Sequence, residues 1–179
     1  MISNIIVALI SIPARIKGMK LGKNTVIGPG YDFMGIRLKG VSIGNDVVIS
    51  RNAQIGLIGD DKNDQIKIGN GTEIGRNFVC MSHKGVKIGK KCMISYNVSI
   101  LDYEHDFYNP NISPVDAGLS KSDKIVIEDD CFIGSHSFIM KGVKLGKHCV
   151  VSANSVVTNS FPAFSVVAGN PAKLIKVIR

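Results

Sequence analysis

The feature of this sequence that most constrains its fold is a six-residue repeat. Within blocks of three hexads an aliphatic residue leads every hexad, and fourteen of the fifteen leads are Ile, Leu or Val. A fixed short period of this kind is typical of a parallel β-helix, in which each hexad is one short strand plus a corner and three hexads make a triangular coil. The leads are Ile43, Ile49, Ile55, Ile68, Ile74, Cys80, Ile88, Ile94, Ile100, Ile127, Ile133, Ile139, Leu145, Val151 and Val157.

Two further positions of the hexad follow the same period. Four residues after many leads stands a second side chain that can face inward, such as Val47 or Phe78. Three residues after the lead stands a residue that tolerates a left-handed backbone, usually Asn, Asp or Gly. His136 and His148 occupy this turn position, so we interpret both as structural.

Composition is consistent with one compact domain that has a basic surface. The chain has 179 residues, 45% of them hydrophobic, and a net charge of +8. An excess of positive charge suggests a polyanionic partner, which can be nucleic acid, an anionic membrane or a phosphate-rich cofactor. The charge is spread along the chain, Trp is absent and no nucleic-acid-binding motif is present, so we expect no nucleic-acid partner.

The cysteines fall into the repeat. Cys92, Cys131 and Cys149 take the same inward position in three successive coils, and Cys80 replaces an aliphatic lead. Stacked strands lie about 4.8 Å apart with parallel side chains, whereas a disulfide needs a Cβ separation of about 3.5–4.5 Å. We therefore expect buried, reduced thiols that serve packing, and a reducing, cytoplasmic location.

Residues 1–20 precede the solenoid. The apolar run 2–12 is too short to span a bilayer and lacks the features of a signal peptide. We expect residues 1–20 to cap the open end of the solenoid. Peripheral membrane contact through residues 2–17, at the inner face of the membrane, is the alternative.

Insertions interrupt the repeat only after the third lead of a coil, so they are expected to leave the same corner of the solenoid. The longest fall at 57–67 and 101–126, and a shorter one carries His83. Loops on one edge of a solenoid commonly form its binding face. The loop at 57–67 is acidic, which suits a solvated turn as well as a substrate-binding loop.

His105, in the longest insertion, is the candidate catalytic base. Histidine has an unperturbed pKa of about 6.5, which suits proton transfer from a hydroxyl and back to a thiolate. The segment Ser99-Ile-Leu-Asp-Tyr-Glu-His-Asp-Phe-Tyr-Asn resembles the one that bears the catalytic histidine in sugar and polysaccharide O-acetyltransferases of the hexapeptide-repeat acyltransferase family. The resemblance extends over residues 21–179 and implies a left-handed β-helix.

The resemblance also implies roles for the residues around His105. It makes His105 the general base, with Asp102 or Asp106 as the carboxylate that orients the imidazole; the sequence does not choose between them. The loop residues expected to bind the acceptor are His83, Tyr103, Phe107 and Tyr108.

The C-terminal coils carry a second resemblance. Ile133-Gly-Ser-His-Ser, Val151-Ser-Ala-Asn-Ser-Val-Val-Thr and Val167-Ala-Gly-Asn-Pro-Ala-Lys-Leu-Ile are similar to the acetyl-CoA-binding end of galactoside, maltose and capsular-sugar acetyltransferases. This implies that Ser135 and Ala153 contact the thioester and pantetheine arm through their backbone, and that Lys173 and Lys176 lie near the phosphates. The family often has Lys directly after Val-Thr, where this chain has Asn159.

The sequence thus predicts an all-β, left-handed parallel β-helix over 21–162, with an N-terminal cap over 1–20 and a C-terminal strand, or a short helix, and tail over 163–179. The function expected is acetyl-CoA-dependent O-acetylation of a hydroxyl on a sugar or a cell-surface polysaccharide precursor, by direct transfer and without a metal. The relatives imply a homotrimer with its active sites between subunits.

Other functions fit the same repeat. An N-acetyltransferase of an amino sugar and a drug (xenobiotic) acetyltransferase differ only in the acceptor. A metalloenzyme similar to the gamma-class carbonic anhydrases would need three histidines at a subunit interface, and only His83 and His105 lie on the loop-bearing edge. A non-catalytic scaffold would need neither His105 nor the C-terminal motif.

Overall fold

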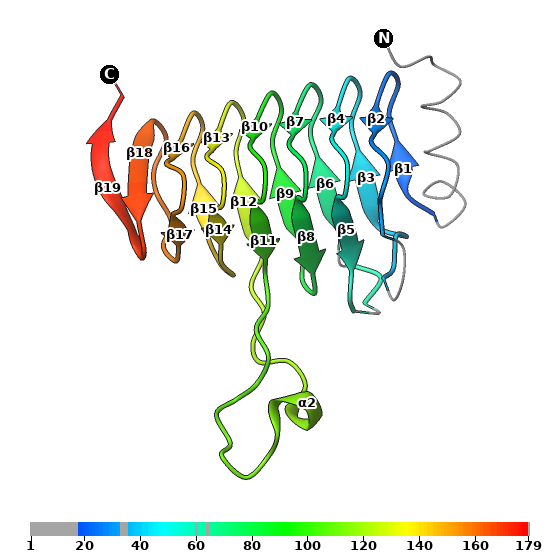
Figure 1. Ribbon diagram of the computed structural model, residues 1–179, viewed down its shortest axis with the longest axis vertical. Coiled ribbons are helices and arrows are strands. Elements are labelled where there is room, and N and C mark those ends of the chain that lie inside the picture. Colours follow the sequence, from blue (N-terminus) through cyan, green and yellow to red (C-terminus); the bar gives the residue numbers. More distant parts are fainter. Residues whose placement is uncertain (1–17, 33–35, 60, 64, 179) are drawn as a thin grey trace.

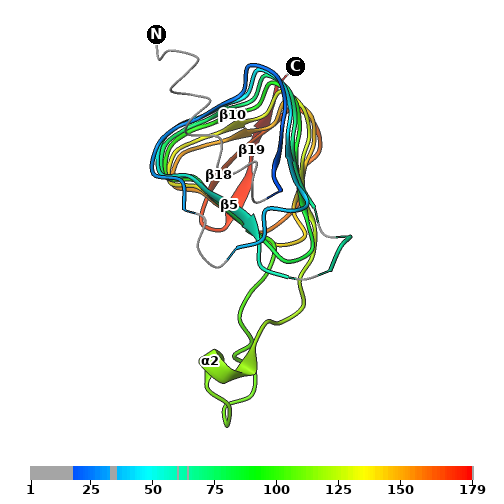
Figure 2. The same cartoon turned by 90° about the vertical axis from the view of Figure 1, so that its right-hand side faces the viewer.

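The computed structural model describes residues 18–32, 36–59, 61–63 and 65–178, which form a three-sided solenoid (Figure 1). Each complete coil contributes one strand to each of three parallel sheets, here called the first, second and third face in chain order. Figure 2 shows the triangular cross-section along the stack of coils. The predicted all-β parallel solenoid is confirmed.

The strands of each face are short and follow the hexad period. The first face comprises β1 (Lys20–Leu21), β3 (Val41–Ile43), β6 (Ile66–Ile68), β9 (Val86–Ile88), β12 (Ile125–Ile127) and β15 (Lys144–Leu145). The second comprises β2 (Val26–Ile27), β4 (Val48–Ile49), β7 (Glu73–Ile74), β10 (Met93–Ile94), β13 (Phe132–Ile133), β16 (Val150–Val151), β18 (Ser165–Gly169) and β19 (Ala172–Val177). The third comprises β5 (Gln54–Leu57), β8 (Val79–Ser82), β11 (Ser99–Leu101), β14 (Phe138–Ile139) and β17 (Val156–Val157).

The repeat leads form the core. Leads of successive coils are paired in register, as Ile43 with Ile68 and Ile55 with Cys80. All fifteen leads are buried, and so are the second inward positions represented by Val47 and Phe78. The buried column runs the length of the solenoid because every coil repeats the same inward pattern.

The corners have the backbone that the turn residues predict. Asp46, Asn52 and Asn77 have φ values of 55°, 60° and 56°, and the two turn histidines, His136 and His148, have φ values of 59° and 58°. The structural interpretation of both histidines is therefore confirmed by their backbone conformation.

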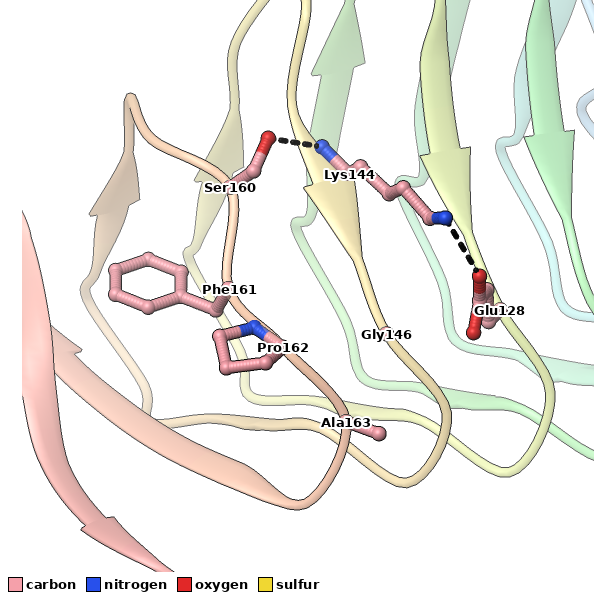
Figure 3. Close-up of a pocket in the computed structure, with 7 residues that line it drawn as sticks. All are labelled: Glu128, Lys144, Gly146, Ser160, Phe161, Pro162 and Ala163. Carbon is pink, nitrogen blue, oxygen red and sulfur yellow. Dashed lines mark hydrogen bonds and ion pairs between the residues drawn. The ribbon is translucent and has the colours of Figure 1, made fainter.

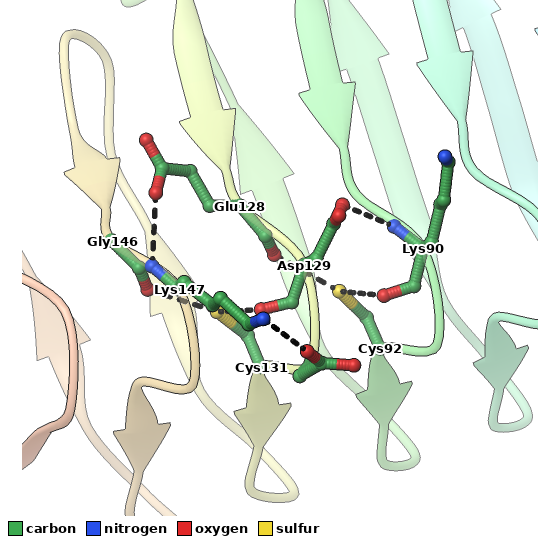
Figure 4. Close-up of polar contacts among 8 residues, drawn as sticks. Lys90, Cys92, Glu128, Asp129, Cys131, Gly146 and Lys147 are labelled. Carbon is green, nitrogen blue, oxygen red and sulfur yellow. Dashed lines mark hydrogen bonds and ion pairs between the residues drawn. The ribbon is translucent and has the colours of Figure 1, made fainter.

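The inward cysteines also act as hydrogen-bond donors. The Cys92 thiol donates to the carbonyl of Glu128 and the Cys131 thiol to that of Gly146, each at 3.2 Å (Figure 4). Thr72, at the same position of an earlier coil, makes the equivalent bond through its hydroxyl. All four cysteines are buried and carry free thiols. The expected packing role is thus joined by a second one, which is to satisfy corner carbonyls that face the interior.

The insertions all leave the corner between the third and first faces, here called the loop corner (Figure 2). Residues 102–124, between β11 and β12, project farthest from the solenoid (Figure 1). Their tip carries the short helix α2 (Pro114–Ala117), whose N-cap Ser113 accepts a hydrogen bond from the Val115 amide. The helix has no buried residue, so the tip has no core of its own.

The C-terminal segment closes one end of the solenoid with strands. β18 pairs in parallel with β16, and β19 turns back antiparallel to β18, so the helix allowed for in the prediction is replaced by a strand pair. Before it, residues 160–163 extend the edge of the first face: the Lys144 amide donates to the Ser160 hydroxyl at 2.8 Å (Figure 3). A shallow cavity of about 330 Å³ lies beside this segment.

Residues 1–17 lie outside the described residues. The expected N-terminal cap and the membrane contact through residues 2–17 therefore concern a part of the chain that is not described. Among the described residues, no helix has the length and apolar character needed to cross a bilayer.

Candidate active site

The two limbs of the 102–124 loop run antiparallel near the solenoid. His105 forms an isolated bridge with Leu119, and the Asp106 amide donates to the Gly118 carbonyl at 3.0 Å. Pairing of the limbs gives His105 a defined backbone position although the loop is long.

The His105 side chain is exposed, and no described residue hydrogen-bonds to its ring. The Tyr103 ring meets the imidazole edge to face, with centroids 6.2 Å apart. Burial raises the pKa of Tyr103, and the charge of Asp102 adds to this. Farther out, Phe107 and Tyr108 are stacked at 4.7 Å and are 60% and 70% exposed. The imidazole and these aromatic rings are therefore open to a ligand or a partner chain.

Asp102 is fully buried and serves the neighbouring turn. Its carboxylate accepts hydrogen bonds from the Ser82 hydroxyl at 2.6 Å and from the amides of His83, Lys84 and Gly85 at 2.7, 2.9 and 2.6 Å. Four donors compensate the cost of burying this charge. In a single chain Asp102 therefore fixes the turn that carries His83.

The other carboxylate considered as the partner of His105 also bonds elsewhere. Asp106 accepts a hydrogen bond from the Tyr108 amide at 3.0 Å. Within one chain, the described contacts join neither Asp102 nor Asp106 to the His105 ring. Orientation of His105 by a carboxylate therefore stays a prediction.

His83 lies half-buried at the same corner, and its ring contacts the returning limb of the long loop. Its Nδ1 is 3.0 Å from the Ser122 hydroxyl, and Ser122 is buried in the returning limb. The two insertions that carry His83 and His105 thus meet in one cluster. Ser122 was not among the residues singled out from the sequence, because only the return of the loop brings it to His83.

Lys141, in the turn after β14, anchors the base of the long loop. Its ammonium is 2.8 Å from the Glu104 carboxylate and donates to the Lys121 carbonyl at 3.1 Å. The bond to Glu104 raises the pKa of Lys141. Sequence reasoning missed this contact because it joins two coils at a distance set by the stacking.

Ser135 and Ala153 lie at a different corner, between the second and third faces. No described residue accepts a hydrogen bond from the amide N–H of either one. At the corner between the first and second faces the corresponding Lys90 amide is capped by the Asp129 carboxylate at 2.8 Å (Figure 4). The corner with Ser135 and Ala153 therefore offers free backbone donors, as a ligand held through backbone contacts requires.

The basic residues expected near the phosphates lie on β19. Lys173 and Lys176 are exposed, and neither forms an ion pair with a described residue. Their charges are available for an anionic ligand at this end of the solenoid.

A metal centre, the alternative, would need at least three ligating side chains close together. Among the described residues of one chain, no three His, Cys, Asp or Glu side chains lie close enough together to hold a metal ion.

Comparison with known proteins finds similarity over the repeat. A family model, the hexapeptide repeat of succinyl-transferase, matches residues 65–102 and 124–159. A probable acetyltransferase from Mycobacterium tuberculosis is 28% identical over 90% of this chain and 55% of its own length. A 2,3,4,5-tetrahydropyridine-2,6-dicarboxylate N-acetyltransferase from Staphylococcus aureus is 50% identical over 29% of this chain and 22% of its own length. The chain thus spans about half or less of these relatives.

Solved structures with the same architecture are acyltransferases. AntD, an N-acyltransferase from Bacillus cereus solved with dTDP and 3-hydroxybutyryl-CoA, has a TM-score of 0.72 at 23% identity, over 93% of this chain and 87% of its own. The polySia-specific acetyltransferase NeuO has a TM-score of 0.58 at 25% identity, over 89% of this chain and 81% of its own.

The fold and the repeat together define a left-handed β-helix of the hexapeptide-repeat class. The family model matches the hexapeptide repeat itself, and both curated relatives are named as acetyltransferases.

Proposed function

We propose that this chain is an acetyl-CoA-dependent O-acetyltransferase that acts on a hydroxyl of a sugar or of a cell-surface polysaccharide precursor. The observation that carries the proposal is the open imidazole of His105, held beside aromatic rings on a loop of a hexapeptide solenoid. Exposed aromatic rings suit the apolar faces of a sugar ring, and the imidazole suits a hydroxyl.

The proposal assigns a step to each group. His105 takes the proton of the acceptor hydroxyl as the oxygen attacks the acetyl carbonyl, and it returns a proton to the departing thiolate. Free amides at the corner of Ser135 and Ala153 hold the acyl donor, and backbone N–H groups stabilise the oxyanion. Lys173 and Lys176 contact phosphates of the donor. Acetyl-CoA supplies the acetyl group.

These groups lie on two corners, so we infer that two chains complete one site. His105 follows a strand of the third face, whereas Ser135 and Ala153 follow strands of the second face. The loop tip exposes Val115 (90%) without any core, and a projecting loop of this length needs support. A homotrimer supplies it when the loop of one chain covers the flank of the next, which is a heterologous contact closed by three-fold symmetry.

The second face offers a surface for that contact. A groove of about 770 Å³ follows it, bordered by the same corner as Ser135. The outward side chains Val48, Met93 and Phe132 are 44%, 52% and 38% exposed. Exposed Glu73 stands between Val48 and Met93 in this column, which is otherwise apolar. An exposed apolar surface of this kind marks an interaction site.

Transfer to a nitrogen, such as that of an amino sugar, is the second candidate function, because the S. aureus relative, 50% identical over 29% of this chain, is an N-acetyltransferase. The two products differ in chemistry: mild alkali removes an O-acetyl ester and leaves an N-acetyl amide intact. Mass spectrometry after incubation with acetyl-CoA and a panel of cell-surface sugar precursors, with and without alkali, distinguishes them.

The base is tested by His105→Ala. We expect the fold to remain and turnover to fall by about 10²–10⁴, because a general base contributes that factor. The control is His148→Asn, which alters a histidine in a left-handed turn where the first coil carries Asn24, and it should leave turnover unchanged. If His105→Ala keeps near wild-type turnover while His83→Ala abolishes it, His83 is the base.

A further inference from the structure

A pocket of about 230 Å³ lies on the first face beside the loop corner. Its walls combine the side chains of Val86, Ile125 and Val126 with the amides of Asn63 and Gln65. Four lysines also line it: Lys67, Lys84, Lys87 and Lys124. We call this site the lysine pocket.

Among the described residues, no carboxylate forms an ion pair with the lysines of the lysine pocket. All four lysines are exposed, and none pairs with a described carboxylate, whereas Lys144, on the same face, is 3.1 Å from Glu128. Two acids lie within electrostatic reach: the bond from the Asn63 amide is the main cause that lowers the pKa of Asp61, with a smaller contribution from Lys84. The bond from Lys144 is the main cause that lowers the pKa of Glu128, with a smaller contribution from Lys87. Four like charges around one pocket repel one another, and an anion in the pocket relieves that repulsion.

The lysine pocket adjoins the cluster of loop-corner residues. Lys84 directly follows His83, and Lys124 lies two residues after Ser122, whose hydroxyl meets the His83 ring at 3.0 Å. The buried Asp102 carboxylate binds the Lys84 and Gly85 amides, so the backbone between His83 and the pocket is fixed. An anion in the pocket would therefore lie at a set position relative to His83.

Gly85 keeps the pocket open. It has φ +142°, and an added Cβ would lie 3.1 Å from the Gln65 carbonyl oxygen and 3.7 Å from Cε of Lys124. A side chain here would crowd Gln65 and Lys124, two of the residues that line the pocket. The volume suits one phosphate or carboxylate group rather than a whole nucleotide, because sites for drug-sized ligands are larger, about 300–1,000 Å³.

We propose that the lysine pocket binds an oxyanion carried by the acceptor, so that the acceptor is an anionic saccharide. This inference rests on the proposed function and narrows its substrate class. The oxyanion is a phosphate of an activated sugar or a carboxylate of an acidic sugar. Lysine recognises both as point charges without the fixed geometry of arginine.

Isothermal titration calorimetry of the full chain, without acetyl-CoA, tests the pocket with three probes: glucose 1-phosphate, glucuronate and glucose. We expect glucose 1-phosphate or glucuronate to bind more tightly than glucose, and the preference to weaken with added salt. Binding of glucose 1-phosphate alone assigns a phosphate, and binding of glucuronate alone assigns a carboxylate; either result supports the proposal.

The variant Lys84→Gln/Lys124→Gln should weaken binding of the anionic probe about tenfold or more, and leave glucose unchanged. Lys67→Gln/Lys87→Gln is a second variant on the opposite wall with the same expectation. The control is Lys90→Gln/Lys147→Gln, which removes the same charge at the next corner. Equal binding of all three probes, or an equal loss in the control, overturns the proposal. Acetyl release from acetyl-CoA is measured separately and reports on the proposed function alone.

Discussion

The side chain two residues after each lead determines whether a corner of the solenoid has free backbone donors. Where this side chain accepts a hydrogen bond from the coil before, the corner is closed; where it does not, the corner is open. At the first corner Asn45, Asn70 and Asp129 each accept a hydrogen bond from the amide two residues after the lead in the coil before. At the second corner Ser135 and Ala153 occupy the same position, and their side chains provide no such cap. The same backbone geometry thus gives a satisfied corner and a corner with free donors.

Ala153→Asn should close the open corner. Its side-chain oxygen would accept from the Ser135 amide as Asn70 does from Asn45, so we expect the KM for acetyl-CoA to rise at least about tenfold. The free energy of unfolding should stay the same or rise by about 1 kcal/mol. Steady-state kinetics and urea denaturation measure the two effects. Asp129→Asn keeps an existing cap and serves as the control; an unchanged KM in Ala153→Asn would contradict the assignment.

Cys131 tests whether the buried thiols act as donors. Cys131→Ala leaves the Gly146 carbonyl without its partner, so the free energy of unfolding should fall by about 1–3 kcal/mol. Cys131→Ser should lose less, because a hydroxyl donates at the same position in Thr72. Urea denaturation compares the two variants. If the Ala variant is as stable as the Ser variant or more so, packing alone explains the cysteines.

At this scale, the sequence predicts inward and turn positions well because the period determines them. Ile100 faces inward and His136 sits in a left-handed turn for that reason alone. Partners such as Ser122 for His83 are different, since they depend on how a loop returns. The lysine pocket is predictable in part. Lys67 and Lys87 stand one residue before a lead of the first face, which is an outward position that the register already defines.

The loops form one unit because two side chains tie them to the solenoid. Asp102, at the end of β11, holds the turn between β8 and β9. Lys141, after β14, holds Glu104 and Lys121 in the two limbs of the long loop. Three successive coils therefore share the geometry of the loop corner.

Asp102→Asn should loosen that unit. A neutral amide offers one acceptor oxygen where the carboxylate serves four donors, and its NH₂ group faces another donor. We expect a loss of about 3 kcal/mol or more in the free energy of unfolding. Amide hydrogen exchange at residues 83–85 should accelerate. Asp123→Asn, exposed on the same loop, is the matched control; equal stability of the two variants would show that the four bonds contribute little.

Insertion lengths placed the loops at the correct corner, because every insertion follows a third lead. The period predicted neither the paired limbs, nor α2, nor the C-terminal strand pair of β18 and β19. Each of these depends on hydrogen bonds that do not repeat with the hexad. The proposed contacts of His105 with a second chain depend on assembly, which the hexad period does not determine.

Across the whole molecule, the faces differ in character. The outward column of the first face contains Lys20, Lys67, Lys87 and Lys144, whereas that of the second face is largely apolar. A lysine-rich face disfavours contact with its own copy, and an apolar face favours it. The proposed trimer therefore leaves the lysine pocket accessible while it covers the second face.

Met93→Glu places a charge on that apolar face. We expect wild-type protein to sediment at about three times the chain mass of 19.3 kDa, and the variant to sediment as a smaller species with little activity. Its circular dichroism should remain that of a β-solenoid, because Met93 points away from the core. Lys90→Glu, exposed at the first corner, should stay trimeric. A fully active wild-type monomer at the assay concentration would contradict the shared site.

Mixing two variants that are both impaired when acetyl-CoA is well below its KM tests directly whether a site draws on two chains. A His105→Ala chain keeps an intact corner for the acetyl donor, and an Ala153→Asn chain keeps an intact base. In a trimer that contains both, a complete site forms wherever the loop of an Ala153→Asn chain meets the flank of a His105→Ala chain. After the variants are unfolded together and refolded at equal amounts, about a quarter of the sites should be complete, because chains join at random around the three-fold axis. Acetyl transfer should recover to a similar fraction of wild type. Recovery cannot occur if His105 and Ala153 serve the same site within one chain. Acetyl transfer by the mixture that does not exceed the average of the two variants would therefore place the whole site in a single subunit.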